Sequence, residues 1–505
     1  MAIETDRCHV AIVGSGIMGA AVAQLIREAS PEAYIVMLEA GRALGPTPGQ
    51  HLHDVPEGDL RSAYRARVAS GVQGLYVGAG AADDLGAELA KTAPGMYHLS
   101  TFGEDSAAMP TAALAWNTGG MGVHWTAATP AAWGQEVPDF IDASEWAADM
   151  DRAQSVLRVN PDPVGPSALR TALLGALNEI FAPVAASGRE VQPLPMAVNP
   201  DANGGLVRTG PNLMFLPISE GGDPRFELRS GCLVTRILHD GGRVSGVRLR
   251  DVQTGAVSDL GSDVTVVCAD VFRTPQLLFA SDIKPDALGC YLNEHAFLTG
   301  RASVALDRIG IEPALLAQER SGEWSHTSFW LPHSDAAQPF NGQLSGTVRF
   351  SPEGEPVDSF AGLAMYVPTE TRRANRVEFS ATELDAAGMP RMRIRFERSE
   401  RDLELVELAR SYQQRAGARI GHLDPATDSV LLPPGTSLHM TGTSRMGPTD
   451  DGTSVCDPDS RVWGFDNLFL SGCGVVPTAL VGNSTLTGVV TAVRAARAAA
   501  QQLNS

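Results

Sequence analysis

The sequence predicts an α/β protein in which one domain is built on a parallel sheet and a second domain on an antiparallel sheet. Residues 9–39 read as strand, glycine turn, helix and strand, which is the βαβ pattern of a parallel sheet. Short β-prone runs separated by Gly-rich turns follow at 226–278 and at 291–396, where they predict antiparallel pairing. We therefore expect two sheets with different connections between their strands.

Composition narrows the class of protein before any motif is considered. The 505 residues are 44% hydrophobic and 19% charged, which is ordinary globular usage, and no apolar run approaches the ~20 residues that cross a bilayer. The 39 Lys and Arg against 58 Asp and Glu give a formal net charge of −19. Such a charge repels phosphate backbones and anionic lipid surfaces, so neither nucleic acid nor a membrane is an expected partner.

Cysteine spacing and the first residues add two expectations. The six cysteines never fall in CxxC spacing, and no His stands near a Cys pair as zinc sites require, so we expect no metal. Residues 1–7 are charged and lead straight into an apolar run, without the features of a secretory signal. We therefore expect a reduced, cytoplasmic protein.

A glycine-rich turn links the first predicted strand, at 9–13, to the first predicted helix, at 20–28. It reads Gly14-Ser15-Gly16-Ile17-Met18-Gly19 and matches GxGxxG. Gly14 makes the tight turn, Gly16 lets the backbone approach a pyrophosphate, and Gly19 lets the helix pack on the strand. The next predicted strand ends in Glu39, where a carboxylate accepts hydrogen bonds from an adenine ribose. The unit predicts dinucleotide binding, with an ordinary strand-to-helix turn as the alternative.

The turn does not by itself distinguish FAD from NAD. It lies at the start of the chain, and no second GxGxxG follows. A flavoenzyme reduced by NAD(P)H usually needs a second such site. If the ligand is FAD, we therefore expect the electrons to come from the substrate.

A second block begins at Trp116 and reads Trp-Asn-Thr-Gly-Gly-Met-Gly-Val-His-Trp-Thr. Its adjacent glycines, Gly119 and Gly120, indicate backbone that closely approaches a flat ligand, while His124 and Thr126 offer polar groups to one edge of that ligand. The alternative is a buried loop whose histidine only satisfies backbone groups.

Three further motifs follow one another near the C-terminus. They are Ser437-Leu-His-Met-Thr-Gly-Thr-Ser-Arg-Met-Gly447, Asp459-Ser-Arg-Val-Trp-Gly-Phe-Asp-Asn-Leu-Phe-Leu-Ser-Gly472 and Gly482-Asn-Ser-Thr-Leu-Thr487. This series resembles the C-terminal region of the glucose-methanol-choline (GMC) oxidoreductases, which are FAD enzymes that oxidise alcohols. Within that superfamily the sequence is most similar to the pyranose oxidases and to bacterial FAD oxidases that attack the sugar 3-hydroxyl of C- and O-glycosides. The block around His124 is typical of that branch.

Two positions depart from the family pattern. The signature Gly-Ala-x-x-Thr-Pro-x-Leu-Leu reads Ala269-Asp-Val-Phe-Arg-Thr-Pro-Gln-Leu-Leu278 here. The usual Asp-Ala-Ser near the flavin is Gly472-Cys-Gly474, as it is in pyranose oxidases. Neither change removes a catalytic group.

The resemblance implies roles for individual residues. His439 matches the family's catalytic histidine and Asn483 its hydrogen-bonding partner. An unprotonated imidazole can take a hydroxyl proton while hydride passes to flavin N5, and an amide can hold the same oxygen. The predicted helix that begins at Ser484 and Thr485 would present its N-terminal dipole to negative charge on the flavin.

Other matches concern the cofactor. His124 matches the residue to which pyranose oxidases attach FAD covalently, and Thr126 matches a residue close to flavin N5. Val234 matches the position whose backbone holds the adenine. Relatives with non-covalent FAD exist, so both modes of attachment stay open for this chain.

The resemblance implies the GMC fold, with its domains interleaved along the chain. Residues 1–150, 205–290 and 430–505 are expected to form an FAD-binding Rossmann-like domain, and 151–204 with 291–429 a substrate-binding domain. The chain itself gives no indication of an oligomeric state.

The favoured activity is oxidation of the glucosyl 3-hydroxyl of a C- or O-glycoside to a ketone, with O₂ reduced to H₂O₂. Alternatives are a pyranose 2-oxidase that acts on free monosaccharides and a sugar dehydrogenase that uses a quinone. An NAD-dependent dehydrogenase and a non-catalytic flavin-binding module are the rivals from other classes. The last would have no use for His439 and Asn483.

Overall fold

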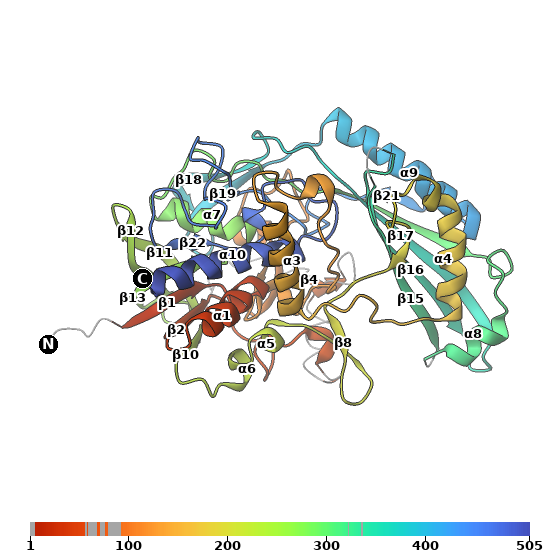
Figure 1. The fold of residues 1–505 in the computed structure, drawn as a ribbon, viewed down its shortest axis with the longest axis horizontal. Coiled ribbons are helices and arrows are strands. Elements are labelled where there is room, and N and C mark those ends of the chain that lie inside the picture. The colour runs from red at the N-terminus through yellow and green to blue at the C-terminus, as the bar shows by residue number, and fades with distance from the viewer. Residues whose placement is uncertain are drawn as a thin grey trace.

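The computed structural model describes residues 6–55, 58, 68–70, 76–78, 92–321, 323–334 and 337–504. In this part of the chain two seven-stranded sheets organise the fold (Figure 1). Each sheet has its own buried apolar cluster. The mixed α/β class predicted from the sequence is confirmed.

The first sheet has the strand order β10-β2-β1-β13-β12-β11, with β22 added beside β13. Strand β1 runs parallel to β2 and β13, and β10 and β22 are parallel to their neighbours as well. Strands β11, β12 and β13 form an antiparallel meander. The bounds are β1 Arg7–Val13, β2 Ile35–Glu39, β10 Phe226–Ser230, β11 Cys232–Asp240, β12 Arg243–Asp251, β13 Val257–Val267 and β22 Leu468–Leu470.

The hairpins expected between 226 and 278 are confirmed for β11, β12 and β13 and are wrong for β10. That strand lies against β2, on the far side of the glycine turn from the meander. The sequence of such a short strand does not show which strand it pairs with, because the flanking loops decide where the strand lies in the sheet. The sheet therefore gains a parallel edge that the local pattern did not reveal.

Helices α1 (Ile17–Ala29) and α10 (Thr485–Leu503) pack against each other beside this sheet, so two helices far apart in the sequence lie side by side (Figure 1). Both helices bury rows of alanine, which allow a close approach of their backbones. Helix α3 (Ala143–Leu157) packs on α10. Its Asp149 pairs with Arg494 at 2.7 Å, and both side chains are 3% exposed. The expected C-terminal helix is confirmed.

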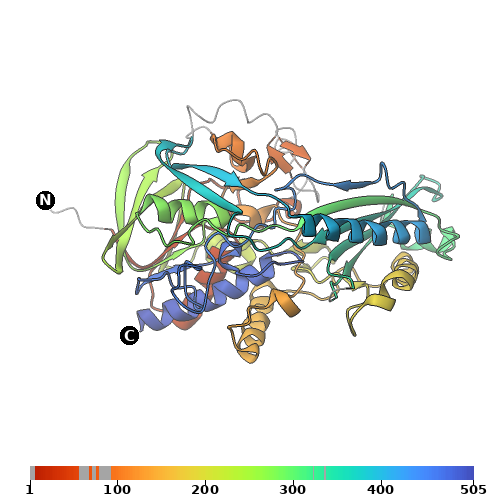
Figure 2. The same cartoon turned by 90° about the horizontal axis from the view of Figure 1, so that it is seen from above.

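The second sheet is antiparallel and has the order β20-β14-β17-β16-β15-β7, with β21 beside β14. Helices α4 (Ala168–Phe181) and α9 (Glu400–Ile420) lie beside this sheet (Figure 2). They contribute apolar side chains to the same cluster as its strands. Along β16, Leu344 and Val348 enter this cluster while Gln343 alternates to the other face. The strand bounds are β7 Gln192–Pro193, β14 Ala296–Val304, β15 Trp324–Leu331, β16 Asn341–Phe350, β17 Pro356–Val367, β20 Gly421–His422 and β21 Ser429–Leu431.

Two strands expected in this antiparallel sheet lie elsewhere. Strands β18 (Arg376–Leu384) and β19 (Pro390–Arg395) form a separate hairpin. Its Val377 and Met392 are buried in the apolar cluster of the first sheet, near helix α7 (Asp270–Ala280). Alternation predicts a strand but not the core to which its apolar face turns. The two-domain boundaries given above stay a prediction.

Shorter elements complete the described part of the chain. They are β3 Val68–Ser70, β4 Tyr76–Gly78, β5 Gly95–His98, β6 Ala113–Trp116, β8 Val198–Pro200, β9 Leu206–Arg208, α5 Pro211–Met214, α6 Pro217–Glu220 and α8 Pro313–Glu319. None of the described helices combines the length and the apolar character that crossing a membrane requires.

Candidate active site

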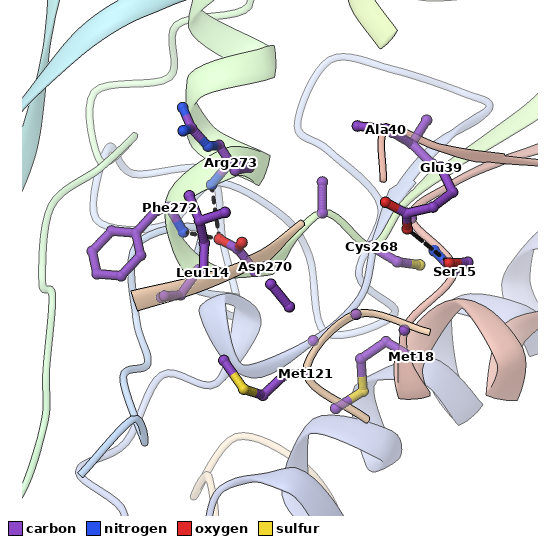
Figure 3. A pocket seen from close by; sticks show the side chains of 18 of the residues that line it. Ser15, Met18, Glu39, Ala40, Leu114, Met121, Cys268, Asp270, Phe272 and Arg273 are labelled. Carbon is purple, nitrogen blue, oxygen red and sulfur yellow. Dashed lines mark hydrogen bonds between the residues drawn. The ribbon is translucent and has the colours of Figure 1, made fainter. Parts of the chain in front are cut away.

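A cavity of about 270 Å³ lies where the parallel strands β1, β2 and β13 end (Figure 3). In open α/β sheets ligands bind at the carboxyl ends of the strands, which is where this cavity lies. Many of the predicted site residues line it: Gly14, Gly16, Glu39, Gly120, Val234, Gly472, Ser484 and Thr485. The other predicted residues are not among the described residues that line the cavity. They are Gly19, Gly119, His124, Thr126, His439 and Asn483.

The glycine turn is tight because three backbone segments meet in it. Gly14 has a φ of 104°, and a Cβ there would lie 2.5 Å from the carbonyl oxygen of Cys268. A Cβ on Gly19 would lie 2.0 Å from the carbonyl oxygen of Gly14. Gly19 is thus a packing glycine behind the cavity, whereas a Cβ on Gly16 would meet nothing closer than 3.8 Å. At its glycines the turn brings backbone to the cavity wall, and Ser15, Ile17 and Met18 line the same wall.

Glu39 lies across the cavity from α7 and is fixed by the glycine turn (Figure 3). Its Oε2 accepts hydrogen bonds from the Ser15 backbone N–H at 3.1 Å and the Ser15 hydroxyl at 2.7 Å. Its Oε1 accepts the Gly41 N–H at 2.8 Å. Burial raises the pKa of the Glu39 carboxyl, and these donors oppose that rise. Glu39 also lines the cavity, where a carboxylate can accept a hydrogen bond from a ligand hydroxyl.

Two helices point uncapped N-termini at the cavity. The N-cap residues are Gly16 for α1 and Ser484 for α10, and neither has a side chain that accepts a hydrogen bond from an N–H group of the first turn. Helix α7 differs, because the Asp270 carboxylate accepts the N–H groups of Phe272 at 2.6 Å and Arg273 at 2.9 Å (Figure 3). Uncapped helix N-termini offer free N–H groups and a positive dipole end to negatively charged ligand groups. The cavity is therefore suited to an anionic ligand that reaches both α1 and α10.

The loop after Trp116 forms one wall of the cavity, through Gly120, Met121 and Trp125. His124 is buried and is not among the described lining residues, and its Nε2 lies 2.8 Å from Oδ1 of Asn117. Burial lowers the pKa of His124 to about 3, so the ring is neutral. Thr126 is half-buried and directly follows Trp125.

An ion cluster that the sequence did not indicate closes another part of the wall. Arg273 of α7 lines the cavity and pairs with Glu104 at 2.9 Å and with Asp385 at 2.6 Å. Both carboxylates are fully buried, and burial raises the pKa of Glu104. Asp385 begins the turn between β18 and β19, and that turn contributes Ala387 and Met389 to the lining. The ion cluster therefore fixes the hairpin against the cavity.

His439 and Asn483 come together at the edge of the cavity. Nδ2 of Asn483 lies 3.0 Å from Nε2 of His439. Their neighbours in sequence, Leu438, Met440 and Ser484, line the cavity. Leu438 has a φ of 58°, a left-handed conformation that costs an L-residue about 1–2 kcal/mol and turns the chain just before His439. Both predicted catalytic side chains thus lie beside the pocket that the glycine turn opens.

The second sheet supplies three side chains that the motifs did not predict. His295, just before β14, places Nε2 2.8 Å from Nδ1 of His439. Gln343 of β16 donates to Oδ1 of Asn483 at 2.8 Å, and Tyr366 of β17 donates to Oε1 of Gln343 at 2.9 Å. None of the three stands in a recognisable pattern, so spacing alone offered no signal for them.

Both histidines are held neutral. Burial lowers the pKa of His439 well below its ordinary value, and the neighbouring His295 lowers it further. Burial likewise lowers the pKa of His295 to about 4. A neutral imidazole with an unprotonated nitrogen beside a ligand cavity can act as a general base.

Comparison with known proteins places this geometry in context. Two protein-family models match, both described as GMC oxidoreductase, one over residues 126–297 and the other over residues 371–492. A C-glycoside 3-oxidase of Arthrobacter globiformis is 39% identical to the chain, over 98% of the chain and 95% of that protein. A C-glycoside 3-oxidase of Microbacterium trichothecenolyticum is 36% identical, over 98% of the chain and 97% of that protein.

More distant similarities extend the same comparison. A pyranose 2-oxidase of Tricholoma matsutake is 27% identical, over 78% of the chain and 74% of that protein. Among solved structures, pyridoxine 4-oxidase from Mesorbium loti superposes with a TM-score of 0.59 over 97% of the chain and 98% of that chain. At 17% identity that structural match shows a shared fold alone.

Proposed function

The chain belongs to the GMC oxidoreductase family, and from this premise we propose that it is an FAD-dependent enzyme that oxidises a hydroxyl of a glycoside. The favoured reaction converts the 3-hydroxyl of a glucosyl unit to a ketone, with O₂ as the electron acceptor and H₂O₂ as its product. The observation that carries the proposal is the pair formed by His439 and Asn483 at the edge of the cavity.

The residues present fit FAD. The glycine turn and the uncapped start of α1 suit a pyrophosphate, the Glu39 carboxylate can accept a hydrogen bond from a ribose hydroxyl, and Val234 lines the cavity where an adenine would contact backbone. The uncapped start of α10 at Ser484 offers N–H groups to negative charge on the flavin ring. When bound, FAD supplies the acceptor for the hydride that leaves the substrate carbon.

His439 would act as the base. Asn483 donates its amide N–H to Nε2 of His439, so this nitrogen carries the lone pair. A substrate hydroxyl placed between the two side chains could give its proton to Nε2 and accept a hydrogen bond from the amide. The amide would thereby hold the oxygen and orient the C–H bond of the same carbon.

The choice of sugar position follows from the relatives. Two relatives above 30% identity are named C-glycoside 3-oxidases, and they match nearly the full length of the chain. The pyranose 2-oxidase of Tricholoma matsutake is more distant. We therefore favour the 3-hydroxyl of a glycoside over the 2-hydroxyl of a free sugar.

We further propose that the FAD is held without a covalent bond. Asn117 donates its amide to the carbonyl oxygens of Thr118 and Gly120, so its Oδ1 faces His124 as an acceptor. Nε2 of His124 therefore carries a proton and is engaged with the protein. In that state Nε2 has no lone pair for a bond to the cofactor. The lone pair of the neutral ring is on Nδ1, and His124 is not among the described residues that line the cavity.

Anaerobic reduction of the purified protein by a substrate panel tests this function. Bound flavin absorbs near ~450 nm. We expect C- and O-glycosides to bleach this band faster than free monosaccharides, with a 3-keto product identified by NMR. The fully reduced protein is then mixed with O₂ or with a quinone, and the faster reoxidation identifies the acceptor. A colourless protein, or a flavin that no sugar or glycoside reduces, would contradict the proposal.

A further inference from the structure

A continuous chain of hydrogen bonds runs through the candidate catalytic pair. Its members, in order, are Tyr366, Gln343, Asn483, His439, His295 and the backbone carbonyl of Leu480. Three of the side chains come from the second sheet or the segment leading into it, and the other members lie at 439–483. Because each link joins one donor to one acceptor, the proton positions along the chain depend on one another.

The backbone carbonyl of Leu480 decides which group donates and which accepts in each hydrogen bond of the series. A carbonyl oxygen can only accept, and Nδ1 of His295 lies 3.4 Å from it, so this Nδ1 carries the proton. Burial keeps His295 neutral, and its Nε2 must then be an acceptor. Across 2.8 Å from that acceptor, Nδ1 of His439 must be the donor.

The same reasoning continues through the other half of the chain. With its proton on Nδ1, neutral His439 presents an unprotonated Nε2, which accepts the Asn483 amide at 3.0 Å. Asn483 then turns Oδ1 to the Gln343 amide at 2.8 Å, and Oε1 of Gln343 accepts the Tyr366 hydroxyl at 2.9 Å. Reversing every link would require Nδ1 of His295 to accept from a carbonyl, which has no proton to give. One proton arrangement therefore satisfies all the links.

From this geometry we propose that His295 is a positioning residue that locks His439 in the tautomer with its proton on Nδ1. Nε2, which accepts the Asn483 amide here, thereby keeps a lone pair that can take the proton of a substrate hydroxyl. This inference rests on the proposed function and deepens it. In the reaction, the hydroxyl proton moves to Nε2 of His439, and the resulting imidazolium keeps donating its Nδ1–H to neutral His295. No further proton has to leave the pair for the base to act.

Packing holds the two rings in this relation. The ring of His295 lies 4.7 Å from the ring of Tyr366, and that of His439 lies 5.4 Å from it, so one aromatic ring contacts both imidazoles. Glu294 carries the nearest carboxylate in sequence, but it accepts hydrogen bonds from Gly435 and Ser437 instead. Among the described residues, the Tyr366 phenol is thus the titratable group whose ring contacts both imidazoles.

The loop that carries Leu480 and Asn483 is fixed by one buried carboxylate. Oε1 of Glu136 accepts the backbone N–H groups of Val481, at 2.5 Å, and Gly482, at 3.2 Å. The same carboxylate therefore holds the segment that carries the Leu480 carbonyl and the Asn483 amide. Glu136 thus keeps the Leu480 carbonyl and the Asn483 amide in fixed positions relative to each other.

A direct test reads the tautomer by NMR. Protein labelled with ¹⁵N in histidine gives two-bond ¹⁵N–¹H correlations in which protonated and unprotonated ring nitrogens resonate far apart. His439→Ala assigns the signals of His439 by their disappearance. We expect Nδ1 protonated and Nε2 unprotonated in the flavin-loaded protein at neutral pH. The opposite pattern in the unsubstituted protein would overturn the proposal, whatever the substrate is.

Two substitutions at His295 provide the kinetic test. His295→Leu removes the acceptor, and we expect the limiting rate of anaerobic flavin reduction to fall on the order of 10²-fold with little change in apparent sugar affinity. His295→Gln retains an acceptor oxygen and should restore most of the rate. Flavin content and melting temperature establish that both variants fold, and His422→Leu, at an exposed position of β20, is the matched control.

The possible results separate this inference from the proposed function. If no sugar reduces the flavin, the proposed function fails, while the NMR result still decides the tautomer. If sugars reduce the flavin but His295→Leu keeps both the rate and the His439 spectrum of the unsubstituted protein, the positioning role of His295 is refuted.

Discussion

The two ends of the cavity are built in opposite ways. The glycine-rich end consists of Gly14, Gly16, Glu39 and their neighbours, which lie close together in sequence and present mainly backbone. The proposed catalytic end, next to the lining residues Leu438, Met440 and Ser484, consists of the side chains of His439, Asn483, His295 and Gln343, which come from separate segments. One end depends on the absence of side chains and the other on their chemical identity. Substitutions should therefore separate cofactor retention from chemistry.

The largest effect is expected at the catalytic end. His439→Ala removes the base and should slow flavin reduction by about 10²-fold or more while bound flavin is retained, because the glycine-rich end is untouched. Stopped-flow reduction under anaerobic conditions measures the rate, and the visible spectrum measures flavin content. His422→Ala is the control at an exposed histidine. An unchanged reduction rate in His439→Ala would remove His439 from the base role.

The next effect concerns the glycine-rich end. Gly19→Ala places a Cβ 2.0 Å from the carbonyl oxygen of Gly14, and we expect it to lower the free energy of unfolding by about 1–3 kcal/mol and to reduce flavin content. Gly175→Ala is the matched control, since that glycine is also helical but has no atom within 4 Å of its added Cβ. It should raise stability by about 0.5–1 kcal/mol. Equal melting temperatures for the two variants would refute the packing argument.

The dependence of the flavin-reduction rate on pH tests the proposed role of His439 and does not depend on the glycine-rich end. Burial and the neighbouring His295 lower the pKa of His439, so its neutral form persists below the ordinary histidine range. The base is active when unprotonated. The reduction rate should therefore stay level as pH falls through about 6.5 and decline only in more acidic buffer. A decline centred at or above the ordinary histidine pKa would show that His439 is not buried as described.

The smallest expected difference concerns how the cofactor is attached. Acid precipitation should leave the flavin in the supernatant, because Nε2 of His124 is protonated and bound to Asn117. A yellow pellet that keeps its colour through washing would indicate a covalent bond and would overturn this prediction. Either result leaves the roles of His439 and Asn483 open to the tests above.

Much of the first sheet could be predicted because its signals are local. The GxGxxG turn, the strand before it and the acid at the end of the next strand lie within one short stretch, and the structure brings Gly14, Gly16 and Glu39 to one cavity. Alternation likewise predicted the meander of β11, β12 and β13. The parallel pairing of β10 and the separate hairpin of β18 and β19 could not be predicted, because pairing and packing depend on long-range delivery of a strand.

Sequence by itself determined the α/β class, the glycine turn, the family resemblance and the nomination of His439 and Asn483. Tertiary structure alone decided that His295, Gln343 and Tyr366 meet that pair, that Arg273 binds Glu104 and Asp385, and that His124 is buried beside Asn117. The physical reason is the separation in sequence between the residues that interact. A turn is specified by a few adjacent residues, whereas the proton arrangement of a buried imidazole depends on a carbonyl and side chains that only folding brings within hydrogen-bonding distance.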